Sequence, residues 1–386
     1  MHLTTEEEKM YDGEQGWAYQ VSMRMLTRLG DLFGATRLIP IKTAHLSGVS
    51  YKTIGDPAIE FLEELARTEG KVQVEATLNP SSVDSSLMKF SKVQNTKQRK
   101  IIDLYKKMGA TSTLTCTPYY LKHFRPGTHL AWAESSAVIY ANSVLGAHTN
   151  REGSPSALAA ALIGKTPNYG MHLPENRTPT VLVNIEAKLE NEVEFGALGI
   201  HLGKMLHDKT PFLNSLPAHN NDDLKQLGAA IATAGMTDMF QTTNPSQNIW
   251  QEKITVERKE IESTMESLNT TAKRPDLVFL GCPHCSAEEL RKAAKLLDGK
   301  KVRNDLQLWI CTSKWLKKKA KNHVAIIEKA GGRVVCDTCA IVTWLRDLGI
   351  NSLITNSAKT AYYAPTMNKV DTVFAPLGRC LKTACK

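Results

Sequence analysis

The sequence lacks the features that would place it in a membrane or on a secretion route. In its 386 residues no uncharged apolar run approaches the roughly eighteen residues that a membrane-spanning helix needs. The first residues, MHLTTEEEKMYDG, are polar and acidic, whereas a secretory signal needs a basic start and an apolar stretch. A Walker sequence is absent, and GALGIHLGK, from Gly196, does not fit the G-x-G-x-x-G pattern of nucleotide-binding loops. We therefore expect a cytoplasmic protein with no membrane contact and no nucleotide site.

The charge balance is positive but does not single out one kind of partner. A formal net charge of +9 favours an anionic partner, such as a small acid, a phosphate, an acidic protein or nucleic acid. One basic stretch, KWLKKKAKNH from Lys314, could serve as a nucleic-acid patch. Helical spacing, however, turns Trp315, Leu316 and Val324 toward a core and the lysines toward water. We expect a solvated helix face at this stretch and no nucleic-acid partner.

The cysteines raise the most definite question. In a reducing compartment the eight cysteines are poor candidates for disulfides, so metal binding or burial must account for most of them. Four of them form two Cys-x-x-Cys pairs, Cys282 with Cys285 in LGCPHCS and Cys336 with Cys339 in VVCDTCA. A zinc knot, a redox pair and an iron-sulfur site all use such pairs. The two pairs by themselves leave these three alternatives open.

The first part of the chain reads as a helix followed by short strands. Thr4 with Glu7, and Thr5 with Glu8, both fit a capping box, and the run that follows carries apolar residues at helical spacing. Short apolar runs such as RLIPI, KVQVEATL and PTVLVNIEAKL then predict strands.

A regular alternation of strand-like and helical patterns begins near residue 275. Strand-like runs alternate with helical ones there, which is typical of an α/β domain with a mostly parallel sheet. The polar segment ESLNTTAKRP precedes this region. We therefore expect a main α/β domain over residues 1–273 and a smaller α/β domain over residues 274–386.

A third cysteine, Cys116, favours the iron-sulfur site among these three alternatives. Cys116 lies in TSTLTCTPYYL, a short β-branched run that leads into a turn, so it should lie at the end of a strand. Cys282 and Cys339 also follow inferred strands, at the end where open α/β sheets place ligands. Three cysteines from separate loops suit a cubane cluster with one open iron, a Lewis acid that can take up a substrate hydroxyl. Considered alone, Cys116 would be interpreted as an ordinary buried cysteine.

Seven segments, in order along nearly the whole chain, carry a resemblance to a known family. They are TAHLSGVSY, TLNP, TCTPY, WAESSAVIYANSVLGAHTNREG, GCPHC, DTC and TNSAKTAYYAP. This set resembles the aconitase X family. The resemblance implies an aconitase-like, multi-layer α/β fold with parallel sheets and a cluster site between domains. It also implies a hydro-lyase that removes water from a phosphorylated hydroxy acid, with dehydration of a hydroxyproline as the alternative within the family.

The resemblance implies a 4Fe-4S cluster held by three cysteines, one from each motif: Cys116 of TCTPY, Cys282 of GCP and Cys339 of DTC. Cys285 and Cys336 would then not be ligands, although each is close enough in sequence to a proposed ligand to replace it. The alternative from a different class is a zinc-stapled binding protein that uses all four paired cysteines.

The resemblance also implies a set of substrate contacts on loops. HLSGVS offers consecutive backbone N-H groups that suit a phosphate or carboxylate, and TNSAK offers a hydroxyl and a cation for an oxyanion. On sequence alone these loops could be plain turns or a solvated lysine. The expected contacts are Gly48, Val49, Ser50, Asn79, Pro80, Ser357 and Lys359.

Two charged residues and a partner complete the expected site. Glu134 could orient groups or relay a proton, and Arg151 could clamp a carboxylate in bidentate fashion. In aconitase-like enzymes the base is a serine on a separate swivelling domain, and we expect this chain to stop short of that domain. The resemblance therefore implies a small partner subunit that carries the swivelling domain and the catalytic serine.

Overall fold

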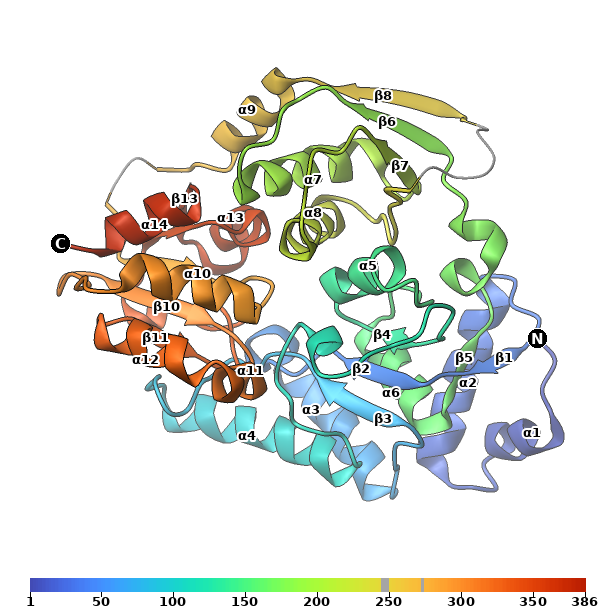
Figure 1. Ribbon diagram of the computed structural model, residues 1–386. Helices are drawn as coiled ribbons and strands as arrows, with labels where there is room; N and C mark the ends of the chain where they lie inside the picture. The colour runs from blue at the N-terminus through green and yellow to red at the C-terminus, as the bar shows by residue number, and fades with distance from the viewer. Residues whose placement is uncertain (244–249, 272–273) are drawn as a thin grey trace. The chain divides into compact units, whose positions relative to one another are not determined.

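Sheets of parallel strands recur along the chain in the computed structural model (Figure 1). The structure describes residues 1–243, 250–271 and 274–386. Two units can be distinguished: the first contains Met1–Val83 and Lys89–Thr178, and the second contains Asp84–Met88 and Pro179–Lys386. The expected α/β class is confirmed. The domain boundary expected after residue 273 falls on a residue outside the described ranges and stays a prediction.

The first unit is built around a parallel sheet of three strands in the order β3-β2-β4. A short antiparallel pair, β1 with β5, lies beside it in the same unit. The strands are β1 Leu38–Pro40, β2 Thr43–Leu46, β3 Glu75–Leu78, β4 Ala131–Trp132 and β5 Lys165–Pro167. The helices are α1 Thr5–Asp12, α2 Trp17–Leu32, α3 Tyr51–Arg67, α4 Lys92–Lys107, α5 Ser135–Ser143 and α6 Ser154–Ile163.

The start of the chain follows the sequence prediction closely. Of the two possible capping boxes, the one that forms joins Thr4 and Glu7, at the start of α1. Gly13 ends this helix with a φ of 96°, a left-handed conformation that glycine adopts without strain. The expected helix is thereby divided into α1 and α2, and α2 carries its buried residues Met23 and Leu26 into the core of the first unit.

The second unit contains two parallel sheets. The smaller has the order β7-β6-β8 and the larger the order β11-β10-β9-β12-β13. Their strands are β6 Val181–Ile185, β7 Pro211–Asn214, β8 Glu252–Val256, β9 Leu277–Leu280, β10 Gln307–Cys311, β11 Arg333–Val335, β12 Ser352–Thr355 and β13 Asp371–Phe374. The helices are α7 Glu192–Leu206, α8 Asn221–Ala234, α9 Arg258–Ser267, α10 Ala287–Leu297, α11 Lys314–Lys319, α12 Lys321–Lys329, α13 Ala358–Tyr363 and α14 Leu377–Ala384.

The glycines of GALGIHLGK serve helix packing. They lie within α7, where a Cβ on Gly199 would come within 2.5 Å of the carbonyl oxygen of Leu227 on α8. A Cβ on Gly203 would come equally close, at 2.5 Å, to the carbonyl oxygen of Ile231. Small residues at these positions let the two backbones approach. This use of glycine agrees with the expectation that the stretch is not a nucleotide-binding loop.

Among the described residues, no helix combines the length and the apolar character needed to cross a membrane.

Candidate active site

Three of the predicted motifs follow three neighbouring strands of the sheet in the first unit. The loop from Ser47 to Ser50 follows β2, Asn79 and Pro80 follow β3, and Glu134 comes two residues after β4. Since these strands are parallel, their carboxyl ends lie at the same edge of the sheet (Figure 1). The fold therefore brings together groups that are up to 86 positions apart, counted from Gly48 to Glu134 (134 − 48).

Hydrogen bonds with Ser154, Tyr105 and Ser82 fix the conformation of the loop after β2. Gly48 has a φ of +72°, and a Cβ at this position would lie 2.2 Å from Oγ of Ser154. Ser154 donates a hydrogen bond of 2.8 Å to the carbonyl oxygen of Ser47, and the Tyr105 hydroxyl donates one of 3.2 Å to that of Gly48. Ser50 shares a hydrogen bond of 2.7 Å with the hydroxyl of Ser82. Only glycine fits at position 48, and the loop has a defined shape before any ligand arrives.

Asn79 and Glu134 are joined directly. Nδ2 of Asn79 donates a hydrogen bond of 2.8 Å to Oε2 of Glu134. The other carboxylate oxygen, Oε1, accepts a hydrogen bond of 2.9 Å from Oγ of Ser136, in the first turn of α5. Glu134 is also the N-cap residue of this helix, so its position is fixed by secondary structure as well as by Asn79.

His45 extends this pair into a network that the sequence prediction did not include. The ring is completely buried in β2, with Nδ1 2.8 Å from Oγ1 of Thr77 and Nε2 3.3 Å from Oδ1 of Asn79. Burial is the main reason why the pKa of His45 falls to about 4. The imidazole is therefore neutral near pH 7.

Cys116 and Arg151 also belong to the first unit. The N-H of Thr115 donates a hydrogen bond of 3.0 Å to the carbonyl of Leu78, the last residue of β3, and the buried Cys116 follows directly. Arg151 is half-buried, and its backbone pairs with that of Trp132 at the end of β4. Cys116 therefore lies beside the end of β3, and Arg151 lies beside the end of β4, at the edge of the sheet that carries Asn79 and Glu134.

The remaining predicted residues follow strands of the larger sheet in the second unit. Cys282 comes just after β9, Cys339 follows β11, and Ser357 and Lys359 follow β12. All of these strands are parallel, so Cys282, Cys339 and Ser357 belong to loops at one edge of the sheet, and Lys359 lies in the first turn of α13, which begins at the same edge. Cys282, Cys339 and Ser357 are buried, and Lys359 is half-buried.

Hydrogen bonds connect these loops to one another. The hydroxyl of Ser357 donates to the carbonyl oxygen of Cys282 and accepts the N-H of Thr360, which makes Ser357 the N-cap of α13. His284 lies between the cysteines of GCPHC, and its Nε2 is 3.1 Å from the carbonyl oxygen of Thr338. Since a carbonyl can only accept, this nitrogen carries the proton. A single buried histidine thus joins the loop of Cys282 to the loop of Cys339.

In each pair, the cysteine that is not an expected ligand, Cys285 or Cys336, has surroundings that differ from those of the expected ligand. Cys285 packs in the apolar core with Val278, Leu280 and Leu290, and its backbone N-H donates to the carbonyl of Cys311 at 2.8 Å. The backbone N-H of Cys336 donates to Asp84 at 2.9 Å, and burial raises the pKa of this thiol to about 12. A core position and a disfavoured thiolate both make these two cysteines less suited to bind a metal.

A buried charged cluster supports the loop of Cys282, and sequence reasoning missed it. The side chain of Lys225, on α8, is completely buried, and its Nζ pairs with Glu289 and lies 3.3 Å from Asp222. The same ammonium is 3.5 Å from the carbonyl oxygen of His284. Burial raises the pKa of Glu289, and the charge of Lys225 opposes that rise. No local pattern could have revealed the cluster, because Glu289 lies on α10, 64 positions from Lys225 on α8.

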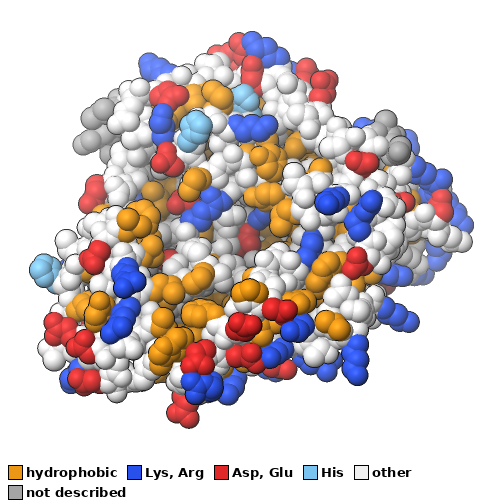
Figure 2. Space-filling view, turned by 180° about the vertical axis from the view of Figure 1, so that it is seen from behind, with side chains coloured by type: hydrophobic (Ala, Val, Ile, Leu, Met, Phe, Trp, Pro, Cys, Tyr) orange, Lys and Arg blue, Asp and Glu red, His pale blue; other side chains and the backbone are white. Residues whose placement is uncertain are grey.

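The basic stretch on α11 makes contacts within its own unit. Leu316 and Val324 are buried as expected, but the expectation for Trp315 was wrong, because its side chain is 38% exposed. The ammonium of Lys319 lies 3.9 Å from the centre of the Trp315 ring, and Lys317 pairs with a glutamate of α12 at 3.0 Å. On the face drawn in Figure 2, acidic side chains lie among the basic ones. These contacts favour a solvated helix face over a nucleic-acid patch.

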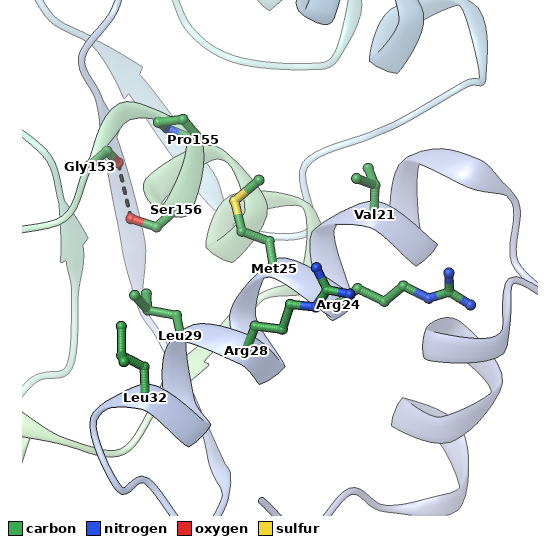
Figure 3. A pocket seen from close by; sticks show the side chains of 9 residues that line it. All are labelled: Val21, Arg24, Met25, Arg28, Leu29, Leu32, Gly153, Pro155 and Ser156. Carbon is green, nitrogen blue, oxygen red and sulfur yellow. Dashed lines mark hydrogen bonds between the residues drawn. The ribbon is translucent and has the colours of Figure 1, made fainter.

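Two cavities of the first unit lie close to the predicted motifs. One, of about 740 Å³, lies between α2 and the start of α6, where apolar side chains such as Met25 and Leu29 and the arginines of α2 line it (Figure 3). None of the predicted site residues lines this cavity. A smaller cavity, of about 280 Å³, is lined by Gly48, Tyr105 and other residues behind the loop after β2.

Family comparisons cover almost the whole chain. The families described as "Aconitase X first domain", "Aconitase X second domain" and "Aconitase X third domain" match residues 1–175, 179–266 and 275–386. The chain belongs to the aconitase X family. A crystal structure of Thermococcus kodakaraensis aconitase X in its holo form superposes with a TM-score of 0.93, at 39% identity and with 100% of each chain covered. The expected aconitase X fold is thereby confirmed.

The curated relatives of this chain carry two names. Five of them, 36–46% identical to this chain, are named phosphomevalonate dehydratase large subunit. The one from Methanocaldococcus jannaschii is 46% identical, with 99% of this chain and 100% of the relative covered. A cis-3-hydroxy-L-proline dehydratase from Pseudomonas aeruginosa is 33% identical, with 96% of this chain but 68% of the relative covered. The chain is thus more similar to the first group than to this second dehydratase.

Proposed function

We propose that this chain is the large subunit of a phosphomevalonate dehydratase, a hydro-lyase. The reaction removes water from (R)-5-phosphomevalonate and gives trans-anhydromevalonate 5-phosphate, in a modified mevalonate route to isoprenoids. The observation that carries the proposal is the identity of 36–46% to five relatives of that name, over 94–100% of this chain. The net charge of +9 also suits a phosphorylated acid. We place the reaction in the cytoplasm.

We infer that Cys116, Cys282 and Cys339 hold a 4Fe-4S cluster. The donor chemistry and the burial support this proposal: each thiol is buried close to the carboxyl ends of parallel strands, and thiolate sulfur is the donor that iron-sulfur clusters use. Cys285 and Cys336 fit less well, because one packs in a core and the other is held as a thiol. When bound, the cluster supplies a Lewis acid toward the hydroxyl that leaves as water.

The loops of the chain itself would bind and orient the substrate. Backbone N-H groups of Gly48, Val49 and Ser50 suit an anionic group, since the loop after β2 is already held in shape by Ser154 and Tyr105. Lys359 and Arg151 are half-buried cations that suit the phosphate and the carboxylate. The remaining proposed contacts are Asn79 and Pro80, while Ser357 would act mainly by holding the loop of Cys282.

Proton handling would be divided between this chain and a partner. Glu134, fixed by Asn79 and by the start of α5, suits a role in orienting or relaying a proton. The base that removes the proton beside the carboxylate would be a serine on the swivelling domain of a small subunit. The name "large subunit" in the five relatives supports such a partner.

The deciding experiment is a turnover assay with anaerobically purified protein, with and without the small subunit. We expect dehydration of (R)-5-phosphomevalonate by the two-subunit enzyme and none by the large subunit alone. Turnover of cis-3-hydroxy-L-proline in preference to phosphomevalonate would overturn the substrate, and full activity of the single chain would overturn the partner.

The cluster ligands can be tested on the same preparations. About four irons and four sulfides per chain should be lost in Cys116→Ala, Cys282→Ala and Cys339→Ala. Cys285→Ala and Cys336→Ala are matched controls that should keep them. Stoichiometric zinc that depends on all four paired cysteines would overturn the cluster and favour a zinc-stapled protein.

A further inference from the structure

The inference concerns His45, a buried side chain with polar partners on both sides. Its ring lies in the central strand β2, and it contacts Thr77 through Nδ1 and Asn79 through Nε2, at 2.8 Å and 3.3 Å. The edge of the Trp132 ring lies against it, with ring centres 6.3 Å apart. Thr77 and Trp132 belong to the three-stranded sheet whose edge carries the proposed substrate loops, and Asn79 directly follows its strand β3.

The chemistry of the neighbours determines which nitrogen of His45 carries the proton. Asn79 has its Nδ2 at 2.8 Å from a carboxylate oxygen of Glu134, and a carboxylate in its ionised form can only accept. The amide group of Asn79 must therefore present Nδ2 to Glu134 and Oδ1 to His45. Since Oδ1 is an acceptor, Nε2 of His45 is the donor.

The other side of the ring completes the assignment. Nδ1 then has no proton and accepts the hydroxyl hydrogen of Thr77. Glu134 is the charged group whose field acts on His45, and it favours protonation, but burial has the larger effect and lowers the pKa to about 4. The neutral ring with a proton on Nε2 is thus the stable form near pH 7.

We propose that His45 is a positioning residue for the dehydration site, acting through Asn79 on Glu134. Its Nε2-H fixes the amide of Asn79 so that the N-H of Asn79 faces the carboxylate. Without this donor the amide could turn over and present its oxygen to Glu134, which would place two acceptors against each other. The inference rests on the proposed function, because Asn79 and Glu134 are taken as its substrate-binding and proton-handling residues.

A matched pair of variants separates positioning from mere support. Glutamine places an N-H close to the position of Nε2, whereas asparagine places its amide close to Nδ1 and reaches Thr77 but not Asn79. We expect His45→Asn to lower kcat about tenfold, the effect of one lost hydrogen bond, and His45→Gln to retain most of the activity. Equal losses in both variants, or no loss in His45→Asn, would overturn the inference.

The pH profile supplies a readout that simple structural damage would not move. A hydrogen bond to a carboxylate stabilises its charged form, so loss of the Asn79 contact should raise the pKa of Glu134. The acid limb of the rate profile should therefore move to higher pH in His45→Asn and stay in place in His45→Gln. An unmoved limb in His45→Asn would contradict a role through Glu134.

The protonation of the ring can be tested without any activity. In the wild-type chain labelled with ¹⁵N-histidine, the His45 resonances, assigned with His45→Gln, should show a protonated Nε2 and an unprotonated Nδ1 at pH 7. The opposite tautomer would overturn the inference even if the enzyme dehydrates phosphomevalonate. Conversely, the expected tautomer in a chain whose two-subunit enzyme does not turn over phosphomevalonate would mean that the proposed function, and not the positioning, has failed.

Discussion

At the scale of single residues, Ser357 was predicted to contact the substrate, but its hydroxyl already has a structural role. Its hydroxyl donates to the carbonyl of Cys282 and caps α13 by accepting the N-H of Thr360. To donate to an anionic group of the substrate, the hydroxyl would have to give up its bond to Cys282, because a hydroxyl has only one proton to donate. We therefore expect Ser357 to act on the site mainly by holding the loop of Cys282.

This expectation leads to a measurable result for Ser357→Ala. The variant should bind less iron after anaerobic purification and should unfold at a lower temperature, because loss of the N-cap costs about 1 kcal/mol and the Cys282 carbonyl loses its donor. Ser357→Thr keeps the hydroxyl and should keep the iron. Iron and sulfide analysis beside a thermal melt distinguishes the two. A full iron content in Ser357→Ala together with a raised KM would instead mean direct contact with substrate.

The limits of sequence prediction are also clearest at this scale. Cys282 could be singled out because it follows an inferred strand at the ligand-binding end of a sheet, whereas Asn79 was selected only through the family resemblance. Which cysteine of a pair faces the core could not be predicted, since the orientation of Cys285 depends on its bond to Cys311 from another strand. His45 gave no signal, because its partners lie 32 and 34 residues away.

At the scale of elements, predictability followed the length and burial of the strands. β9 was readable as the run DLVFLG, because a strand buried on both faces is a continuous apolar segment. The run KVQVEATL overestimated its strand, which covers only Glu75–Leu78. β4 has two residues, Ala131–Trp132, and no pattern of its own; it is a strand because β2 lies beside it. Short elements are defined by their neighbours, which the sequence does not show.

The close approach of α7 and α8 gives an element-scale prediction. Gly199→Ala should destabilise the protein by about 1–3 kcal/mol, because the added methyl group meets the backbone carbonyl of Leu227 and the helices must separate. This penalty opposes the gain of up to about 1 kcal/mol that alanine gives in a helix. Urea unfolding, followed by circular dichroism, measures the difference.

Gly378 provides the matched control for this change. It lies in α14, is exposed, and has no atom within 4 Å of an added Cβ. Gly378→Ala should therefore leave the stability unchanged or raise it slightly. If Gly199→Ala were as stable as Gly378→Ala, close packing of the two helices would not be what requires glycine in α7.

At the scale of the whole molecule, the chain enters the second unit twice. Residues 84–88 belong to this unit, although the segments before and after them belong to the first. Asp84 accepts a hydrogen bond from the N-H of Cys336 at 2.9 Å, and the sulfur of Met88 accepts one from Thr343 at 3.8 Å. The loop that carries Cys339 is thus supported by a segment 252 positions away in the sequence.

Because Asp84 accepts the hydrogen bond of Cys336, we expect that a substitution of Asp84 will loosen the loop of Cys339. Asp84→Ala leaves the buried N-H of Cys336 without its acceptor, at a cost of roughly 1–3 kcal/mol. Hydrogen exchange in the peptide around Cys336 should accelerate, and the iron content should fall. Ser85→Ala, at the exposed neighbouring position, is the control and should match the wild type in both measurements. Unchanged exchange at Cys336 in Asp84→Ala would mean that residues 179–386 order the loop by themselves. The segment of residues 84–88 would then contribute little to the order of Cys336.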